Sequence, residues 1–161
     1  MKRLTLVRHG KSSWKHDLPD EKRPLKKRAY RDGDVVSRTY KEFYTQDAMF
    51  WSSPAVRALE TAKIFKEQLE VPDKNFKIKE SLYTFDEDDL LRIITSCDDS
   101  IEKLVVFGHN PAMTGVVNLL GDKSLDNLPT TGLCVIDFEV DSWKDIKRGK
   151  TLLTLIPKEL A

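Results

Sequence analysis

The chain has 161 residues, of which 40% are hydrophobic and 33% charged, and its formal net charge is +1. These values exclude a disordered chain and the large positively charged surface of a nucleic-acid-binding protein. The length suits one domain over residues 1–161. The apolar run after Lys2 and Arg3 is too short for an export signal or a membrane span, so we expect a cytoplasmic protein. Cys97 and Cys134 lack the spacing of metal ligands, and we expect both to be buried thiols.

The first predicted element is a strand over residues 4–7, whose apolar and β-branched side chains lead into Arg8, His9 and Gly10. Open α/β sheets bind ligands at the carboxyl ends of their strands, which is where Arg8 and His9 stand. A guanidinium fits phosphate oxygens, and a neutral imidazole attacks phosphorus or accepts a proton. Taken alone, however, this tripeptide is more typical of an ordinary strand end with solvated side chains.

Residues 11–24 predict an irregular polar loop, because prolines and charges interrupt any periodic pattern, and such loops often carry binding groups. A helix is predicted over residues 25–44, although Gly33 weakens it. The lysines and arginines of residues 22–31 fit either a solvated helix face or a docking patch. We favour the solvated face, because surface helices normally carry such charges.

A second buried strand is predicted over residues 48–52, followed at once by Ser53 and Pro54, which are typical of an N-cap and the first helical position. Apolar residues continue at helical spacing to Leu69, so Arg57 falls in the first turn. Its guanidinium should lean back over the strand end, because helical side chains tilt toward the N-terminus. A first-turn arginine opposes the helix dipole, and this local conflict favours a functional role.

Residues 76–79 alternate as a third strand, with Glu80 at its carboxyl end. A helix is predicted over residues 86–97, and we interpret its acidic start, residues 86–89, as capping. A metal site is the less favoured interpretation, because these acids lack the alternating oxygen-ligand pattern of calcium loops.

The clearest parallel strand is residues 103–108, which end at His109, and Asn110-Pro111 then favours the start of another helix. Residues 132–140 and 151–156 are further strands with no helical pattern between them. We therefore expect them to pair as an antiparallel edge of the sheet.

The alternation of strands and helices predicts an α/β fold, a three-layer α/β/α sandwich whose sheet is mostly parallel with an antiparallel edge. Strand ends at its carboxyl edge then bring together two arginines, two histidines and a carboxylate: Arg8, His9, Arg57, His109 and Glu80. Such a cluster fits a phosphate monoester or phosphoramidate, whose transfer depends on positioning and charge stabilisation. The arginines would repel a cation, so we expect no metal and no other cofactor.

Three separated segments resemble motifs of the histidine phosphatase superfamily, which has the phosphoglycerate-mutase-like fold. They are Leu6-Val7-Arg8-His9-Gly10-Lys11-Ser12, Ser52-Ser53-Pro54-Ala55-Val56-Arg57-Ala58-Leu59-Glu60-Thr61-Ala62 and Gly108-His109-Asn110-Pro111. The short chain and further segments resemble the SixA-type branch, which is associated with phosphohistidine phosphatases: Lys11-Ser12-Ser13-Trp14, Arg23-Pro24-Leu25, Glu80-Ser81-Leu82-Tyr83 and Thr131-Gly132. Ala29 departs from that branch, which commonly has glycine after Arg28, and we expect this change at a helix start to leave the chemistry untouched.

The resemblance implies that His9 is the nucleophile and carries the phosphoryl group as a phosphohistidine intermediate until water hydrolyses it. It further implies that Arg8, Arg57 and His109 hold the phosphoryl oxygens, with Ser12 as an additional hydroxyl donor. The residue types agree with this role, because the flanking arginines disfavour protonation of His9 and keep its lone pair available near neutral pH.

Glu80 stands where many members of the superfamily carry the acid that protonates the leaving group, and Asp20 in the polar loop is the second candidate. An imidazole departs from phosphorus more readily than an alkoxide does. Hydrolysis of phosphohistidine by a SixA-type enzyme would therefore depend little on how well the acid is positioned.

The resulting hypothesis is a metal-independent phosphatase that removes phosphate from phosphohistidine in a protein. The chain has no long insertion between Glu80 and Lys103 to wall off a small substrate, which favours a protein partner. The alternatives are a small-molecule phosphomonoesterase or mutase of the same superfamily, and a phosphate-binding module without turnover. We expect a monomer whose partner is a phosphorylated protein or a small phosphorylated substrate, with no nucleic acid and no membrane.

Overall fold

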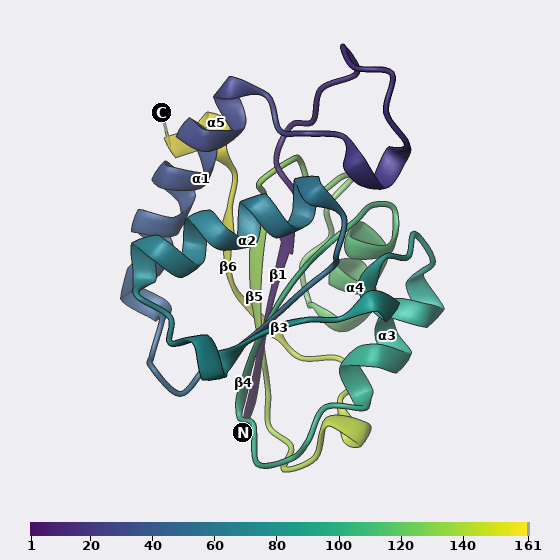
Figure 1. The fold of residues 1–161 in the computed structure, drawn as a ribbon. Helices are drawn as coiled ribbons and strands as arrows, with labels where there is room; N and C mark the ends of the chain where they lie inside the picture. Colours follow the sequence, from purple (N-terminus) through teal and green to yellow (C-terminus); the bar gives the residue numbers. More distant parts are fainter. Residues whose placement is uncertain (161) are drawn as a thin grey trace.

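The computed structural model describes residues 1–160, which form one six-stranded sheet with helices on both faces (Figure 1). The strand order is β3-β2-β4-β1-β5-β6. The strands span Lys2–Arg8 (β1), Met49–Ser52 (β2), Phe76–Ile78 (β3), Lys103–Gly108 (β4), Leu133–Phe138 (β5) and Lys150–Leu155 (β6). The first four strands in the sheet order are parallel, whereas β5 is antiparallel to both β1 and β6, so the predicted mostly parallel sheet with an antiparallel edge is confirmed.

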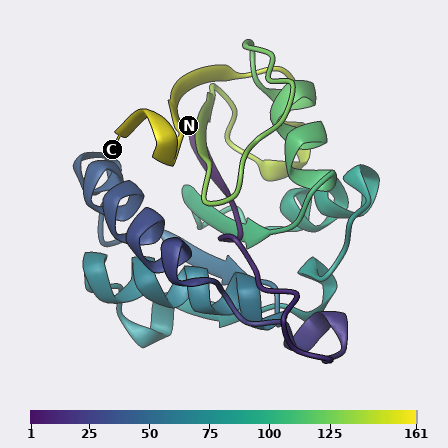
Figure 2. The same cartoon turned by 90° about the horizontal axis from the view of Figure 1, so that it is seen from above.

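The helices lie in two layers, one on each face of the sheet (Figure 2). One layer holds α1 (Lys27–Tyr40) and α2 (Val56–Leu69), with the short α5 (Pro157–Leu160) beside α1, and the other holds α3 (Glu87–Thr95) and α4 (Ala112–Leu120). Alternate residues of the central strand β4 serve the two layers: Val105 and Phe107 pack with α1 and α2, and Leu104 and Val106 pack with α3 and α4. The two-residue period of a strand thus explains why this segment is apolar throughout.

The helix after β2 begins later than predicted, at Val56, with Ala55 in the N-cap position. Ser53 Oγ accepts a hydrogen bond from the Ala55 N–H, but it also lies 2.8 Å from the Nε2 atom of His109. The predicted N-cap at Ser53 is therefore wrong. The Ser53 hydroxyl instead links the end of β2 to the residue that follows β4.

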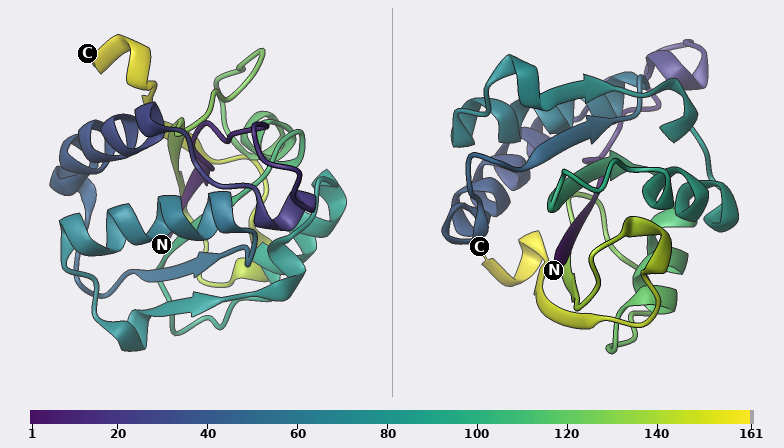
Figure 3. Two further views of the ribbon diagram at one scale, coloured as in Figure 1. Left: turned by 45° about the horizontal axis from the view of Figure 1, so that its top comes forward. Right: turned by 90° about the horizontal axis from the view of Figure 1, so that it is seen from below.

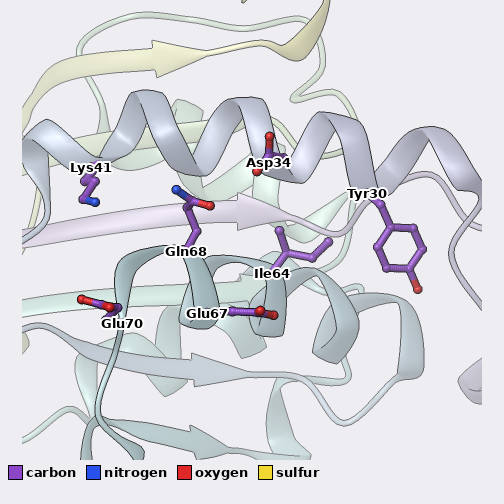
Figure 4. A pocket seen from close by; sticks show the side chains of 7 residues that line it. All are labelled: Tyr30, Asp34, Lys41, Ile64, Glu67, Gln68 and Glu70. Atoms are coloured by element: carbon purple, nitrogen blue, oxygen red, sulfur yellow. The ribbon is translucent and has the colours of Figure 1, made fainter.

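Gly33, which weakened the prediction of α1, lies at the contact between α1 and α2. A Cβ atom at Gly33 would be 3.0 Å from Cδ1 of Ile64, which Figure 4 shows between the two helices. The missing side chain therefore allows the close approach of α2, and tertiary packing offsets the low helix propensity of glycine.

The loop of residues 11–24 is more ordered than predicted, because it pairs with the chain that leads into α1. The Ser13 N–H donates to the Pro24 carbonyl and the Lys26 N–H to the Lys11 carbonyl, each at 2.8 Å. Residues 11–13 and 24–26 thus form a short antiparallel ribbon around the Ser12–Leu25 pair. The chain between its two sides contains a 3-10 turn, η1 (Asp20–Lys22). The loop has no long regular element, but it is tied to the scaffold at both ends.

Cys97 and Cys134 are buried free thiols, as expected. No helix within residues 1–160 combines the length and the apolar character needed to cross a bilayer.

Candidate functional site

A cavity of about 260 Å³ opens at the carboxyl edge of the parallel strands. Arg8 and His9 reach it from the end of β1, and Arg57 reaches it from the first turn of α2, as the sequence predicted. The loop of residues 11–24 forms another wall and lies between α1 and the α3–α4 pair (Figure 3). The remaining residues that line the cavity are Lys11, Ser12, Trp14, Asp20, Arg23, Phe85, Asn110 and Thr130.

His109 lies beside His9, although the two residues are a hundred positions apart in the chain. β1 and β4 are neighbouring parallel strands with Arg8 opposite Gly108, so the residues that follow them meet, and the two ring centroids are 5.3 Å apart. The rings of Tyr83 and Phe85 also lie 5.3 Å from the His109 ring. The structure thus groups both imidazoles at one place.

The backbone next to His9 sets its tautomer. His9 Nδ1 lies 2.7 Å from the carbonyl oxygen of Gly10, and because a carbonyl only accepts hydrogen bonds, Nδ1 carries the proton. The neutral ring then holds its lone pair on Nε2. This is the arrangement that a nucleophilic imidazole requires.

His9 is uncharged at neutral pH. Burial lowers the pKa of His9 to about 4, and the positive charges of Arg57 and Arg8 contribute to this shift, whereas the hydrogen bond to Gly10 opposes it. The sequence predicted the effect of the arginines. The structure adds burial, which is the larger cause.

His109 is also uncharged, and Ser53 orients it. Burial lowers the pKa of His109 to about 3, with further contributions from His9 and Arg57. Ser53 Oγ already accepts the Ala55 N–H, so its own proton is available to Nε2 of His109. In that tautomer the Nδ1 atom of His109 carries a proton and acts as a donor.

Three buried nitrogen atoms of the site have no hydrogen-bond partner within residues 1–160: Nε of Arg8, Nε of Arg57 and Nδ1 of His109. An unsatisfied buried donor costs about 1–3 kcal/mol, and a hydrogen-bond acceptor placed beside these three nitrogen atoms would remove that cost. Phosphoryl oxygens are suitable acceptors. No cluster of three or more His, Cys, Asp or Glu side chains within the same residues offers a metal site.

Arg23 is a third guanidinium of the cavity, and sequence reasoning did not assign it a role in the site. It is 6% exposed, donates to Ser12 Oγ at 2.7 Å and stacks on the Trp14 ring with its Cζ atom 3.5 Å from the centroid. Because Ser12 Oγ accepts from Arg23, its hydroxyl proton remains available to a ligand. The charge pattern of residues 22–31 does not distinguish Arg23 from its neighbours, and the resemblance of Arg23-Pro24-Leu25 to the SixA-type branch was the one signal that could have found it.

The two predicted candidates for the leaving-group acid occupy different places. Glu80 begins a 3-10 turn, η4 (Glu80–Leu82), where it is exposed and does not line the cavity. Asp20 does line it, and its carboxylate accepts hydrogen bonds from Arg57 at 2.9 Å and from the Tyr83 hydroxyl. The structure therefore brings Asp20, and not Glu80, to the other site residues.

Asp20 is held in its ionised form. Partial burial raises the pKa of Asp20, but hydrogen bonds from Tyr83 and Arg57 and the charge of Arg57 outweigh it and lower the pKa to about 2. The carboxylate is thus a charged partner of Arg57 within the site.

Residues 4–83 match the family described as the histidine phosphatase superfamily, branch 1. The matched segment contains Arg8, His9 and Arg57, the residues that β1 and α2 bring to the cavity. The chain belongs to the histidine phosphatase superfamily.

Several solved phosphatase structures match nearly the whole chain. The protein histidine phosphatase SixA complexed with tungstate is 16% identical, with a TM-score of 0.82 and 99% of each chain covered. A protein assigned as the phosphohistidine phosphatase SixA from Agrobacterium tumefaciens is 21% identical, with a TM-score of 0.81 over 97% of this chain and 98% of that chain. A mycobacterial glucosyl-3-phosphoglycerate phosphatase is 10% identical, with a TM-score of 0.69 and coverages of 94% and 97%. No curated protein gives a significant sequence match. At these identities the likeness is one of fold.

The two buried histidines of this histidine phosphatase should make its stability fall in mild acid. Both have pKa values below the ordinary 6.5, so the unfolded chain takes up their protons first as the pH decreases. The free energy of unfolding should therefore be unaffected by these groups above about pH 6.5. Below that it should fall by up to about 1.4 kcal/mol per pH unit for each histidine, down to about pH 4 for His9 and about pH 3 for His109. Urea unfolding at pH 7 and pH 5 measures this slope, and His9→Gln should reduce it. An unchanged slope in that variant would contradict the assignment of a buried neutral imidazole.

Ala29, where the SixA-type branch commonly has glycine, lies close to the residue that orients His9 in this histidine phosphatase. A Cβ atom at Gly10 would lie 2.8 Å from Cβ of Ala29, and Gly10 supplies the carbonyl that orients His9. We expect Gly10→Ala to destabilise the fold by about 1–3 kcal/mol through overpacking and to lower activity. Ala29→Gly in the same chain should restore most of both losses. Thermal unfolding and turnover of the two single variants and the double variant form the cycle, and strictly additive effects would show that the two positions do not interact.

Proposed function

We propose that this histidine phosphatase removes phosphate from phosphohistidine in a protein, without a metal ion, through a phosphohistidine intermediate on His9. The observation that carries the proposal is a buried neutral imidazole with Nε2 unprotonated, set among the guanidinium groups of Arg8 and Arg57. An uncharged nucleophile and fixed positive donors are what transfer of an anionic phosphoryl group requires.

The first step transfers the phosphoryl group from the substrate to His9. Nε2 of His9 attacks phosphorus, the bond between phosphorus and the substrate imidazole breaks, and the released imidazole takes a proton from solvent water. The positive charges of Arg8 and Arg57, with the Nδ1 proton of His109 and the Ser12 hydroxyl, stabilise the three phosphoryl oxygens as charge spreads over them. Arg23 supports this set by holding Ser12.

In the second step water attacks the phosphorus of the phosphorylated His9. The bond between phosphorus and Nε2 breaks, inorganic phosphate leaves and the neutral imidazole is regenerated. The hydrogen bond from Nδ1 to Gly10 is unaffected by either step, so one tautomer serves both.

A protein substrate is supported by the shape and the rim of the site. Only the short η4 turn and α3 lie between β3 and β4, so this segment adds no domain over the cavity. Trp14 is 75% exposed and Phe85 is 47% exposed, and both line the opening. Exposed aromatic side chains at a site entrance are suited to contact a protein surface.

A substrate panel tests the proposal. Phosphate release should be faster from a phosphohistidine peptide than from sugar phosphates or phosphoglycerates, and EDTA should leave the rate unchanged. A clear preference for a small ester would identify a phosphomonoesterase or mutase instead. Binding of phosphate or vanadate without any turnover would identify a phosphate-binding module.

A further inference from the structure

A basic groove lies on the far side of the loop ribbon that borders the cavity. It has a volume of about 480 Å³, and five cationic side chains line it: Lys15, Lys26, Lys27, Arg28 and Arg31. We call these five residues the basic groove. None of the described residues that line it is acidic.

The positive charge of the basic groove is mostly uncompensated. Arg28 lies 3.6 Å from Asp32, whereas none of the other four cations has an ion pair within residues 1–160. Residues 11–31 contain eight lysines and arginines against three acids, in a chain whose net charge is only +1. The positive field is therefore concentrated at one place on the surface.

Folding does not account for these charges. Lys26 is the N-cap of α1 and Lys27 and Arg28 begin it, so all three oppose the helix dipole, and no side chain caps the helix. The start of α3 shows the usual solution in the same chain, where Asp86 caps the helix and acids fill the first turn. The basic start of α1 thus lowers stability, which is typical of residues retained for binding.

The basic groove and the cavity share one structural element. In the antiparallel ribbon, Ser12 is paired with Leu25, and side chains alternate between the two sides. Ser12 and Trp14 line the cavity, whereas Ser13 and Lys15 line the groove. A molecule that covers the rim of the cavity therefore also reaches the groove.

We propose that the basic groove docks an acidic surface of the phosphoprotein substrate beside its phosphohistidine. This inference rests on the proposed function and names the partner chemistry: clustered Asp and Glu side chains close to the phosphorylated histidine. Charge complementarity selects this occupant, since the groove offers cations without counter-ions next to a site that takes a protein-borne phosphoryl group. It takes up the docking patch that the sequence left as the alternative to a solvated helix face for residues 22–31.

Two synthetic peptides test the docking surface without knowledge of the natural partner. Both carry the same central phosphohistidine, one flanked by Asp and Glu and the other by Asn and Gln. We expect kcat/KM to be about tenfold higher for the acidic peptide at low salt, mainly through KM, and the preference to shrink as salt screens the charges. The double variant Lys27→Glu, Arg31→Glu should lose the preference while free phosphohistidine is hydrolysed at the normal rate.

A matched control makes the same change in charge at the other end of the sheet. Lys147 and Arg148 are exposed in the connection between β5 and β6, near the amino end of β1. The control variant Lys147→Glu, Arg148→Glu should keep the preference for the acidic peptide. Thermal unfolding should show no loss of stability in the single variant Lys27→Glu, because an acid in the first turn favours the helix dipole.

Failure of the docking proposal is distinguishable from failure of the proposed function. Peptides with a non-hydrolysable phosphotriazole in place of phosphohistidine report binding by fluorescence anisotropy, whether or not turnover occurs. Equal affinity of the wild-type protein for both peptides, or equal losses in the groove and control variants, would overturn the docking proposal. Tighter binding of a single-stranded RNA than of the acidic peptide at 0.15 M salt, roughly physiological ionic strength, would overturn the choice of an acidic protein.

Discussion

Replacing the proposed nucleophile should have the largest effect of any single substitution: we expect His9→Ala to lower turnover of every phosphorylated substrate by about 10⁴-fold or more. His9 offers the unprotonated Nε2 of the site, because Gly10 fixes the proton on Nδ1 and burial keeps the ring neutral. Rapid quenching with radiolabelled substrate should trap phosphate on the wild-type protein that is labile in acid and stable in base. The His9→Ala variant should carry none.

A matched control for this experiment is His109→Asn. His109 lies 5.3 Å from His9 but is assigned as a donor to phosphoryl oxygens, so its loss should slow the reaction while label still accumulates on His9. Label in the His9→Ala protein, or its absence from wild type and His109→Asn alike, would contradict the covalent mechanism.

Much of the fold follows from local patterns. The apolar run of β4 and the alternation of strands with amphipathic helices predicted the layers and the parallel sheet, because the spacing of apolar residues shows which side chains are buried. The ends of helices that depend on contacts with distant residues were harder to predict from the sequence. Ser53 resembles an N-cap in sequence, yet its hydroxyl contacts His109, a residue 56 positions away. Gly33 disfavours a helix locally, yet it is required by the approach of Ile64.

The candidate site was predictable where a side chain follows a strand directly. Arg8 and His9 stand at such an end, and Arg57 follows from the helix start after β2, so topology alone places them together. Asp20 and Arg23 reach the cavity through an irregular loop whose path depends on its pairing with the start of α1. No periodic pattern encodes that path. Glu80 was the first candidate for the acid because the family resemblance places an acid at its position, and Asp20 in the loop was only the second.

Of the two candidates for the leaving-group acid, Asp20 lies nearer to the proposed reaction, because it lines the cavity and Glu80 does not. Asp20 is ionised in this structure because Arg57 and Tyr83 stabilise its carboxylate. A bound phosphoryl dianion competes for Arg57 and adds negative charge beside Asp20, and both changes raise the pKa of the carboxyl group. If Asp20 takes up a proton in that complex, it can deliver the proton to the leaving group, because its carboxyl group lines the cavity. We therefore expect Asp20→Asn to slow alkyl phosphate esters by about 10²-fold or more and phosphohistidine much less, since imidazole is the better leaving group.

The same substitution should also tighten the binding of inorganic phosphate. The amide introduced by Asp20→Asn would keep the shape of the side chain but remove the negative charge that pairs with Arg57. We therefore expect the inhibition constant of phosphate to fall by roughly tenfold, the equivalent of about 1.4 kcal/mol. Measurement of that constant and of kcat for both substrate classes separates the two roles of Asp20, because a merely structural loss would weaken phosphate binding.

Glu80→Gln is the matched control for the acid. Glu80 is exposed and outside the cavity, so this variant should hydrolyse both substrate classes at the wild-type rate. If Glu80→Gln slowed esters selectively and Asp20→Asn did not, the acid would be Glu80, and η4 would have to move toward His9 when substrate binds. If Asp20→Asn lowered kcat equally for both substrate classes, the role of Asp20 would instead be to position Arg57, because proton donation matters most for the poorer leaving group.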